Sequence, residues 1–123
     1  MAGLIPLFDT NILIDYLKRM PEAEAEIDRY TEIIISVISW IEVMVGCPPA
    51  RRAEFEAFLG DFHRIELDEA IMRRTVEVRR ATKMKLPDAI IYASALVRGQ
   101  LFVTRDVKHL PEGATGVRVP YTF

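Results

Sequence analysis

The sequence predicts a three-layer α/β/α sandwich, in which helices cover both faces of a mostly parallel sheet of four to five strands. Short apolar runs, typical of buried strands, recur along the chain. The longer segments between them space their apolar residues as helices do, and this alternation is typical of a parallel sheet. The chain of 123 residues is long enough to bury a core of its own, and we expect residues 1–123 to form one domain.

The N-terminal half is predicted to contain two strands and three helices. The first strand is the apolar segment LIPLF, and the second is the β-branched segment IIISV. Pro21 opens the second helix, with acids in its first turns, where the helix dipole favours them. Gly46 closes the third helix. In chain order, the expected elements are strand 4–8, helix 11–19, helix 21–31, strand 33–37 and helix 38–45.

The C-terminal half is predicted to contain three helices and three strands. The first of these helices places Phe55, Phe58 and Phe62 at helical spacing. Gly99 ends the last helix. In chain order, the expected elements are helix 50–62, strand 64–67, helix 68–82, helix 86–98, strand 101–104, a loop-rich segment 105–116 and strand 117–119.

Composition narrows the class of protein. The single cysteine cannot form an internal disulfide, which fits a reducing cytosol. The first residues lack the basic start and apolar core of a signal peptide, and no apolar run approaches the roughly 18 residues of a membrane span. We therefore expect a soluble cytoplasmic protein. Its mean hydropathy of +0.13 is high for a small domain, which favours an apolar surface covered by a partner.

The charge is unevenly distributed. The net charge of −2 does not by itself indicate nucleic-acid binding. Residues 72–85, however, hold six basic residues and one acid. Such a stretch could follow an RNA backbone through phosphate contacts, or it could be a solvated helix face. The candidates for RNA contact are Arg79, Arg80, Lys85 and, further along the chain, Arg105.

Four carboxylates stand where an α/β sheet could use them for chemistry. Asp9 directly follows the first strand, although Asp, Thr and Asn at 9–11 are also good helix caps. Glu42 lies on an apolar helix face, where a carboxylate is costly to bury unless a metal or an arginine compensates it, or where it sits at an exposed edge. Asp88 and Asp106 also have ordinary explanations, as a first-turn acid and a loop acid.

The joint placement of the four acids favours a metal site. The carboxyl ends of parallel strands lie at one edge of a sheet, so the acids can converge there. Carboxylates brought together repel one another, and a divalent cation offsets that repulsion. Oxygen ligands suit Mg²⁺ or Mn²⁺ better than zinc, and such an ion can support phosphodiester hydrolysis. No CxxC or HExxH spacing offers a softer site, and we expect His63 and His109 to be structural or surface residues.

Four motifs occur in order along the chain: FDTNILIDYL, SVISWIEVMVG, KLPDAIIYASAL and LFVTRDVKHL. Each motif alone is weak, but together they resemble the motifs of the PIN-domain nucleases in order and spacing. The resemblance is specifically to the VapC-type toxins of bacterial and archaeal toxin–antitoxin pairs, and it covers essentially the whole chain.

The resemblance implies a metal-dependent endoribonuclease that uses Mg²⁺ or Mn²⁺. Four acids would hold the metal and act in catalysis: Asp9, Glu42, Asp88 and Asp106. Supporting polar roles are implied for Asn11, Thr104 and Ser39. The implied partners are an RNA substrate, a second copy of the chain in a homodimer, and a small antitoxin that blocks the active site.

Two other functions are compatible with the pattern. A receiver-like phosphotransfer domain has a similar architecture, but it needs an acidic pair after its first strand, where this chain has Asp9-Thr10-Asn11. It also needs a phospho-accepting aspartate after its third strand, and Asp68 is a poor candidate. The second alternative is an inactive PIN-like module that only binds RNA or protein, and the retention of all four acids disfavours it.

Overall fold

The fold is known from a computed structural model that describes residues 5–123. Within these residues the strands are β1 (Pro6–Phe8), β2 (Ile34–Ser36), β3 (His63–Ile65), β4 (Leu101–Val103) and β5 (Val117–Arg118). The helices are α1 (Thr10–Leu17), α2 (Pro21–Asp28), α3 (Val37–Val45), α4 (Arg52–Gly60), α5 (Glu69–Ala81) and α6 (Leu86–Arg98), with a short 3₁₀ helix, η1 (Pro49–Arg51), before α4.

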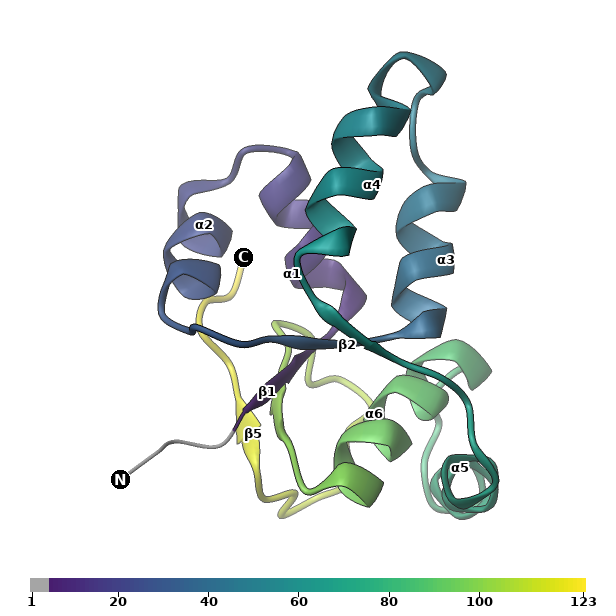
Figure 1. Cartoon of the computed structure of the whole chain (residues 1–123). Coiled ribbons are helices and arrows are strands. Elements are labelled where there is room, and N and C mark those ends of the chain that lie inside the picture. The colour runs from purple at the N-terminus through teal and green to yellow at the C-terminus, as the bar shows by residue number, and fades with distance from the viewer. Residues whose placement is uncertain (1–4) are drawn as a thin grey trace.

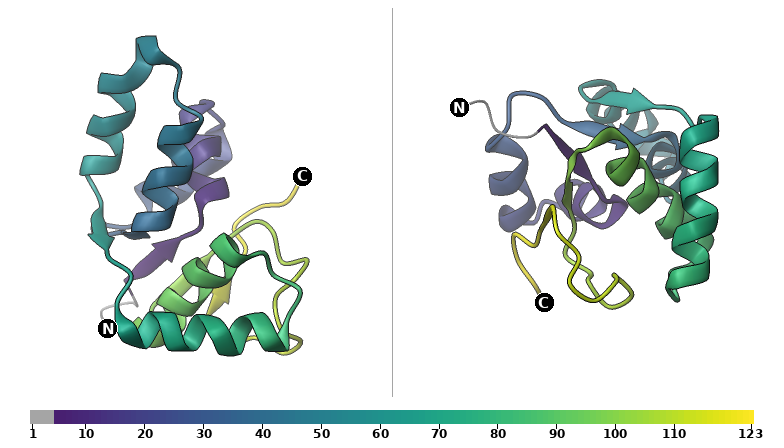
Figure 2. Two further views of the ribbon diagram at one scale, coloured as in Figure 1. Left: turned by 90° about the vertical axis from the view of Figure 1, so that its right-hand side faces the viewer. Right: turned by 90° about the horizontal axis from the view of Figure 1, so that it is seen from below.

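The five strands form one parallel sheet in the order β3-β2-β1-β4-β5, so the first strand of the chain is the central one. Helices α1 to α4 lie on one side of this sheet, and α5 and α6 lie on the other (Figure 1). The same layering is visible when the molecule is turned by 90° (Figure 2). The predicted three-layer sandwich with a parallel sheet is confirmed.

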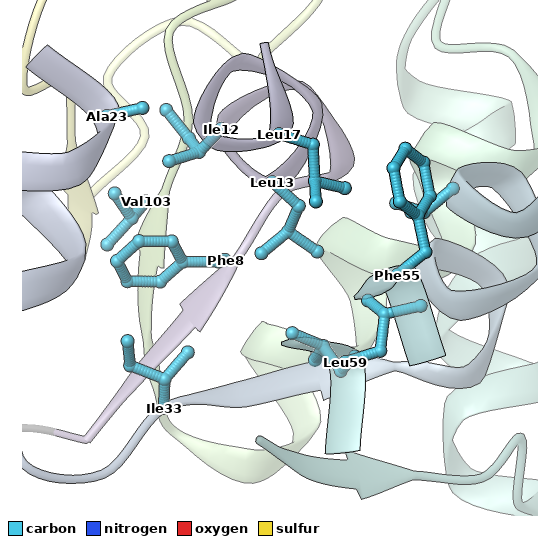
Figure 3. Close-up of a cluster of buried hydrophobic side chains, with 11 residues drawn as sticks. Phe8, Ile12, Leu13, Leu17, Ala23, Ile33, Phe55, Leu59 and Val103 are labelled. Atoms are coloured by element: carbon cyan, nitrogen blue, oxygen red, sulfur yellow. The ribbon is translucent and has the colours of Figure 1, made fainter. Parts of the chain in front are cut away.

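Strand β1 is buried on both faces, and it joins two apolar cores. Phe8 belongs to the core under α1 to α4, where it packs with Ile12 and Leu13 (Figure 3). Its neighbour Leu7 belongs to the core that α6 covers, together with Ile91. Successive side chains of a strand point to opposite faces, so a central strand must be apolar at every position. This requirement explains the uninterrupted apolar segment that precedes Asp9.

Most elements begin and end within three residues of their predicted positions. Predicted helix 11–19 begins one residue earlier, because Asp9 is extended and caps it. Predicted helix 50–62 is wrong at its start, because Pro49 leads a 3₁₀ turn and the α-helix begins only at Arg52. Of predicted strand 4–8, Leu4 lies outside the described residues. No helix in residues 5–123 is long and apolar enough to cross a membrane.

The C-terminal strand is tied to α2 by a buried carboxylate. Glu26 is 3% exposed and accepts hydrogen bonds from Arg118 Nε at 2.7 Å and Nη2 at 2.8 Å. The hydroxyl of Tyr30 also donates to it, at 2.9 Å. Burial alone would raise the pKa of Glu26, but the bonds from Arg118 and Tyr30, with the charge of Arg118, lower it below its usual value. The ionised carboxylate therefore stabilises the fold.

Glu26→Gln is expected to lower the free energy of unfolding at pH 7 by about 2 kcal/mol, as is typical for hydrogen bonds to a charged group. Because the folded pKa is the lower one, this contribution is present above the unfolded pKa of 4.5 and is lost as the pH falls through the folded value. Urea unfolding of both proteins at several pH values measures it. A difference between them that is as large at about pH 3 as at pH 7 would contradict the assignment.

Candidate active site

Asp9 lies at the carboxyl end of β1, and two backbone hydrogen bonds define its position. Its amide donates to the carbonyl of Val103 on β4 at 2.8 Å. Its Oδ1 accepts from the amide of Thr10 at 2.8 Å and caps α1. The residue that caps the helix is therefore Asp9 itself, and its second carboxylate oxygen is left for contacts across the sheet edge.

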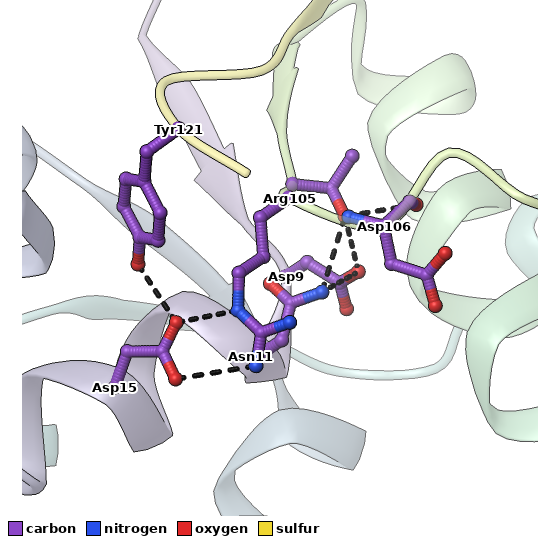
Figure 4. Close-up of polar contacts among 7 residues, drawn as sticks. Asp9, Asn11, Asp15, Arg105, Asp106 and Tyr121 are labelled. Carbon is purple, nitrogen blue, oxygen red and sulfur yellow. Dashed lines mark hydrogen bonds and ion pairs between the residues drawn. The ribbon is translucent and has the colours of Figure 1, made fainter. Parts of the chain in front are cut away.

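Thr104 connects the first acid of the chain to the last. Its buried hydroxyl lies 2.8 Å from Asp9 Oδ2 and donates to it. Thr104 Oγ1 also accepts hydrogen bonds from the Asp106 amide at 3.1 Å and from Asn11 Nδ2 at 3.3 Å. Asn11 Nδ2 is also 3.4 Å from Asp9 Oδ2. Both residues thus hold Asp9, as Figure 4 shows for Asn11.

Glu42 is held by two hydroxyl groups. The Thr10 hydroxyl donates to Glu42 Oε1 at 2.7 Å. Thr10 Oγ1 is also 2.9 Å from Ser39 Oγ. A hydroxyl carries one hydrogen, so Ser39 donates to Thr10 while Thr10 donates to Glu42. Ser39 is fully buried one turn before Glu42, and its hydroxyl acts on the acid through Thr10.

Asp88 and Asp106 line the pocket from different elements. Asp88 is in the first turn of α6, and Asp106 follows β4. Burial and the nearby charge of Asp106 raise the pKa of Asp88, while the charges of Lys85 and His109 act in the opposite direction. The Oδ1 of Asp106 accepts from the Lys108 amide at 3.0 Å. The carboxylates are therefore close enough to repel each other.

A pocket of about 400 Å³ brings the four acids together at the carboxyl edge of the sheet. Burial, with smaller effects of the charges on Asp88 and Glu42, raises the pKa of Asp9 to about 6 despite its hydrogen bonds from Thr104 and Thr10. The pocket therefore concentrates negative charge. Its lining consists of Asp9, Thr10, Asn11, Ile14, Glu42, Met84, Asp88, Phe102, Asp106, His109 and Leu110.

The chemistry of this pocket fits a divalent cation with oxygen ligands. Its four carboxylates and the amide oxygen of Asn11 are hard donors, and the buried Asn11 Oδ1 accepts no hydrogen bond within the described residues. In residues 5–123, no three His, Cys, Asp or Glu side chains are close enough to form a ready metal cluster. Mutual repulsion keeps carboxylates apart, and a cation is the group that would offset it.

The basic candidates separate into different surroundings. Lys85 immediately precedes α6 and lies near enough to Asp88 to lower its pKa. Arg79 donates to the carbonyl of Met84 at 2.6 Å, so it holds the loop before α6. Arg80 is exposed on α5. Arg105 does not line the pocket, and its guanidinium is bound to Asp15. Its contact with RNA stays a prediction.

Three residues near the pocket were missed as functional candidates. Thr10 holds Glu42, and its position directly after Asp9 was the available signal. His109 lines the pocket, although it was expected to be structural or a surface residue. Asp15 binds the residue next to Asp106. No local pattern identifies the last two, because the path of the loop after β4 brings His109 to the pocket and Arg105 to Asp15.

Comparisons with known proteins are consistent with this geometry. The family model for the PIN domain matches residues 7–111. A chain of a toxin–antitoxin complex from Klebsiella pneumoniae is 38% identical, with a TM-score of 0.89, and the match covers 96% of this chain and 99% of that chain. No curated protein matches the sequence significantly.

More distant solved structures share the fold. VapBC from Salmonella typhimurium, solved with DNA, has a TM-score of 0.78 at 22% identity and covers 94% of this chain and 96% of its own. VapBC2 from Rickettsia felis, bound to a DNA fragment from the promoter, has a TM-score of 0.75 at 18% identity, with 85% and 90% covered.

Proposed function

The chain belongs to the PIN-domain family, and from this premise we propose that it is a metal-dependent endoribonuclease that acts as the toxin of a type II toxin–antitoxin pair. One observation supports the nuclease role above all others. Four acids from four separate parts of the chain line one pocket at the carboxyl edge of the sheet. That edge is where α/β proteins bind ligands and perform chemistry.

The residues of the pocket have separable tasks in this proposal. Oxygens of Asp9, Glu42, Asp88 and Asp106 would hold Mg²⁺ or Mn²⁺. When bound, such an ion lowers the pKa of a water molecule and stabilises charge on the attacked phosphate.

The neighbouring residues orient these acids. Thr104 and Asn11 hold the Asp9 carboxylate, and Thr10 holds that of Glu42. The bond from Thr10 fixes Oε1 of Glu42 and leaves Oε2 for a ligand. Both oxygens of Asp9 accept hydrogen bonds, and each carboxylate oxygen keeps a further lone pair for a ligand. Lys85, beside Asp88, is placed to attract a phosphate of the RNA backbone.

Metal removal tests the cofactor. We expect EDTA to abolish cleavage of a panel of defined RNAs and added Mg²⁺ or Mn²⁺ to restore it, because the acidic pocket repels phosphate unless a cation is bound. Product mapping with end-labelled RNA distinguishes internal cleavage from trimming of ends. Cleavage that is equal with and without EDTA would contradict a metal-dependent mechanism.

The proposed partner is an antitoxin. The Klebsiella chain is part of a toxin–antitoxin complex, and the two chains match over nearly their whole lengths. This protein also exposes apolar side chains on α3, with Val45 at 82% and Ile41 at 48%. A protein partner would remove that surface from water. The neighbouring reading frame should encode a small protein that copurifies with this chain and stops RNA cleavage.

A homodimer is part of the same proposal, since exposed apolar side chains also occur on α5, at Met72 and Val76. Light scattering of the purified chain measures its mass directly.

A receiver-like phosphotransfer domain is the alternative function, and it would become labelled by an acyl-phosphate donor. An inactive PIN-like module would bind RNA without cleaving it, whichever divalent metal ion is added.

A further inference from the structure

Two buried carboxylates on the first two helices hold the C-terminal part of the chain. Asp15 on α1 is 2% exposed and accepts from Arg105 Nε at 2.5 Å, from Arg105 Nη2 at 3.3 Å and from the Tyr121 hydroxyl at 2.9 Å. Glu26 on α2 is bound in the same way by Arg118 and a tyrosine hydroxyl. The two sites match in burial and in the kinds of partners, but only the arginine of Asp15 is next to an acid of the pocket.

Arg105 lies between Thr104, which holds Asp9, and Asp106 itself. On one side of Arg105, the sheet holds the main chain through a hydrogen bond from the Thr104 amide to the Arg118 carbonyl at 3.1 Å. At Arg105 the chain has left β4, and the bond to Asp15 holds the residue by its side chain (Figure 4). The ring of Phe123 lies 5.2 Å from the guanidinium carbon.

A bidentate arginine–carboxylate pair fixes geometry as well as contributing energy. The pair with Asp15 is therefore one of two contacts that hold the chain where it leaves β4. The other is the hydrogen bond from the Asp106 amide to Thr104 Oγ1 at 3.1 Å, and Asp106 Oδ1 in turn accepts from the Lys108 amide.

We propose that Asp15 is a positioning residue for the pocket, which through Arg105 holds the segment that presents Asp106. This inference rests on the proposed function in that it takes the pocket as the active site. Asp15 is too deeply buried to touch an RNA substrate, so it acts only through its partner. Without its charge, the partly exposed guanidinium loses its buried carboxylate partner and is released toward solvent. The segment 105–108 is then held less firmly, and Asp106 spends less time at the pocket.

Asp15→Asn and Glu26→Gln form a matched pair of variants. Each neutralises one buried carboxylate with the same kinds of partners, so each should lose a similar amount of thermal stability. Well below both unfolding temperatures, Asp15→Asn is expected to lower kcat for RNA cleavage at least about tenfold with KM changed less than about twofold, the loss typical of a residue that supports a metal ligand. Glu26→Gln should change neither constant by more than about twofold.

A second measurement is independent of metal and of activity. In the metal-free protein, the amides of Asp106 and Lys108 donate the hydrogen bonds of this segment, which protect them from exchange with solvent. Their hydrogen exchange should be at least about tenfold faster in Asp15→Asn than in wild type, and within about twofold of wild type in Glu26→Gln. Equal exchange in the two variants overturns the proposal, as does an equal loss of kcat.

These readouts separate the two hypotheses. If the wild-type protein cleaves no RNA, the proposed function fails, but the exchange comparison still decides whether Asp15 positions the segment. If Asp15→Asn does not fold, Tyr121→Phe replaces it, because this variant removes only one donor to Asp15. It should raise exchange of the Asp106 amide about two- to threefold, and an unchanged rate would overturn the proposal.

Discussion

Asp9→Asn is expected to abolish RNA cleavage and to leave the folded protein more stable at pH 7. Asparagine keeps the size of the side chain but removes the charge that would bind a cation, so we expect activity to fall by more than the roughly 100-fold that loss of a supporting residue can cause. Stability should change in the opposite direction, because burial raises the pKa of Asp9 to about 6 from its usual 3.8. At pH 7 the carboxylate is therefore ionised in a place that disfavours its charge.

The sign follows from proton linkage. A raised folded pKa means that ionised Asp9 destabilises the fold above about pH 6, and that this cost disappears as the pH falls toward 3.8 and the carboxyl takes up a proton. The gain in Asp9→Asn should be about 1–3 kcal/mol at pH 7, since one pKa unit corresponds to about 1.4 kcal/mol. Thermal unfolding in EDTA at pH 7 and at about pH 4 measures it.

A matched control tests whether Asp9 matters only as a helix cap. Asp68 caps α5 in a similar way, with its Oδ1 accepting from the Ile71 amide at 2.9 Å, and it does not line the pocket. Asp68→Asn should keep full activity and gain no stability at pH 7. Cleavage by Asp9→Asn at the wild-type rate would end the assignment of Asp9 to the active site.

Asp88→Asn is expected to have the second-largest effect on activity. Asp88 lies in the first turn of α6 and lines the same pocket as Asp106, whose charge raises its pKa. Its charge also contributes to the raised pKa of Asp9. The variant should therefore lose RNA cleavage by at least about 100-fold and should bring the pKa of Asp9 closer to its usual value. Activity assays and NMR titration of the Asp9 carboxyl in the metal-free protein measure the two effects.

Glu69→Gln is the control for Asp88, because Glu69 is also a first-turn acid, on α5, and lies outside the pocket lining. Both substitutions remove a favourable interaction with a helix dipole, typically about 0.3–1 kcal/mol. If first-turn stabilisation were the whole role of Asp88, the two variants would have similar activity. We expect only Asp88→Asn to be inactive.

The four acids of the pocket could be predicted because each is marked by its neighbours in the chain. Asp9 and Asp106 follow apolar strands, and Asp88 follows a helix-opening proline. In a parallel sheet, such positions are brought to one edge by the topology alone. Glu42 follows neither a strand end nor a helix start, and a carboxylate on an apolar helix face has several explanations. The hydroxyl of Thr10, 32 residues away, is what holds it beside the pocket.

The roles of the arginines could not be predicted in this way. Arg105 appears in the sequence as a basic residue beside an acid, which is compatible with phosphate binding. Its actual partner is Asp15, 90 residues earlier in the chain. Similarly, Arg118 binds Glu26, 92 residues away. Nothing in the sequence near either arginine identifies its carboxylate, because an ion pair depends on where two distant segments meet.

The sequence by itself determined the order of strands and helices, the apolar central strand and the four acids at the edge of the sheet. These features depend on local spacing and on the rule that parallel strands end on one side. Only the tertiary structure decided that Asp9 is the helix cap, that Thr104 links Asp9 to Asp106, and that Asp15 holds Arg105. The physical reason is that hydrogen bonds and buried charges depend on distances of a few ångströms between residues far apart in the chain, which local patterns do not record.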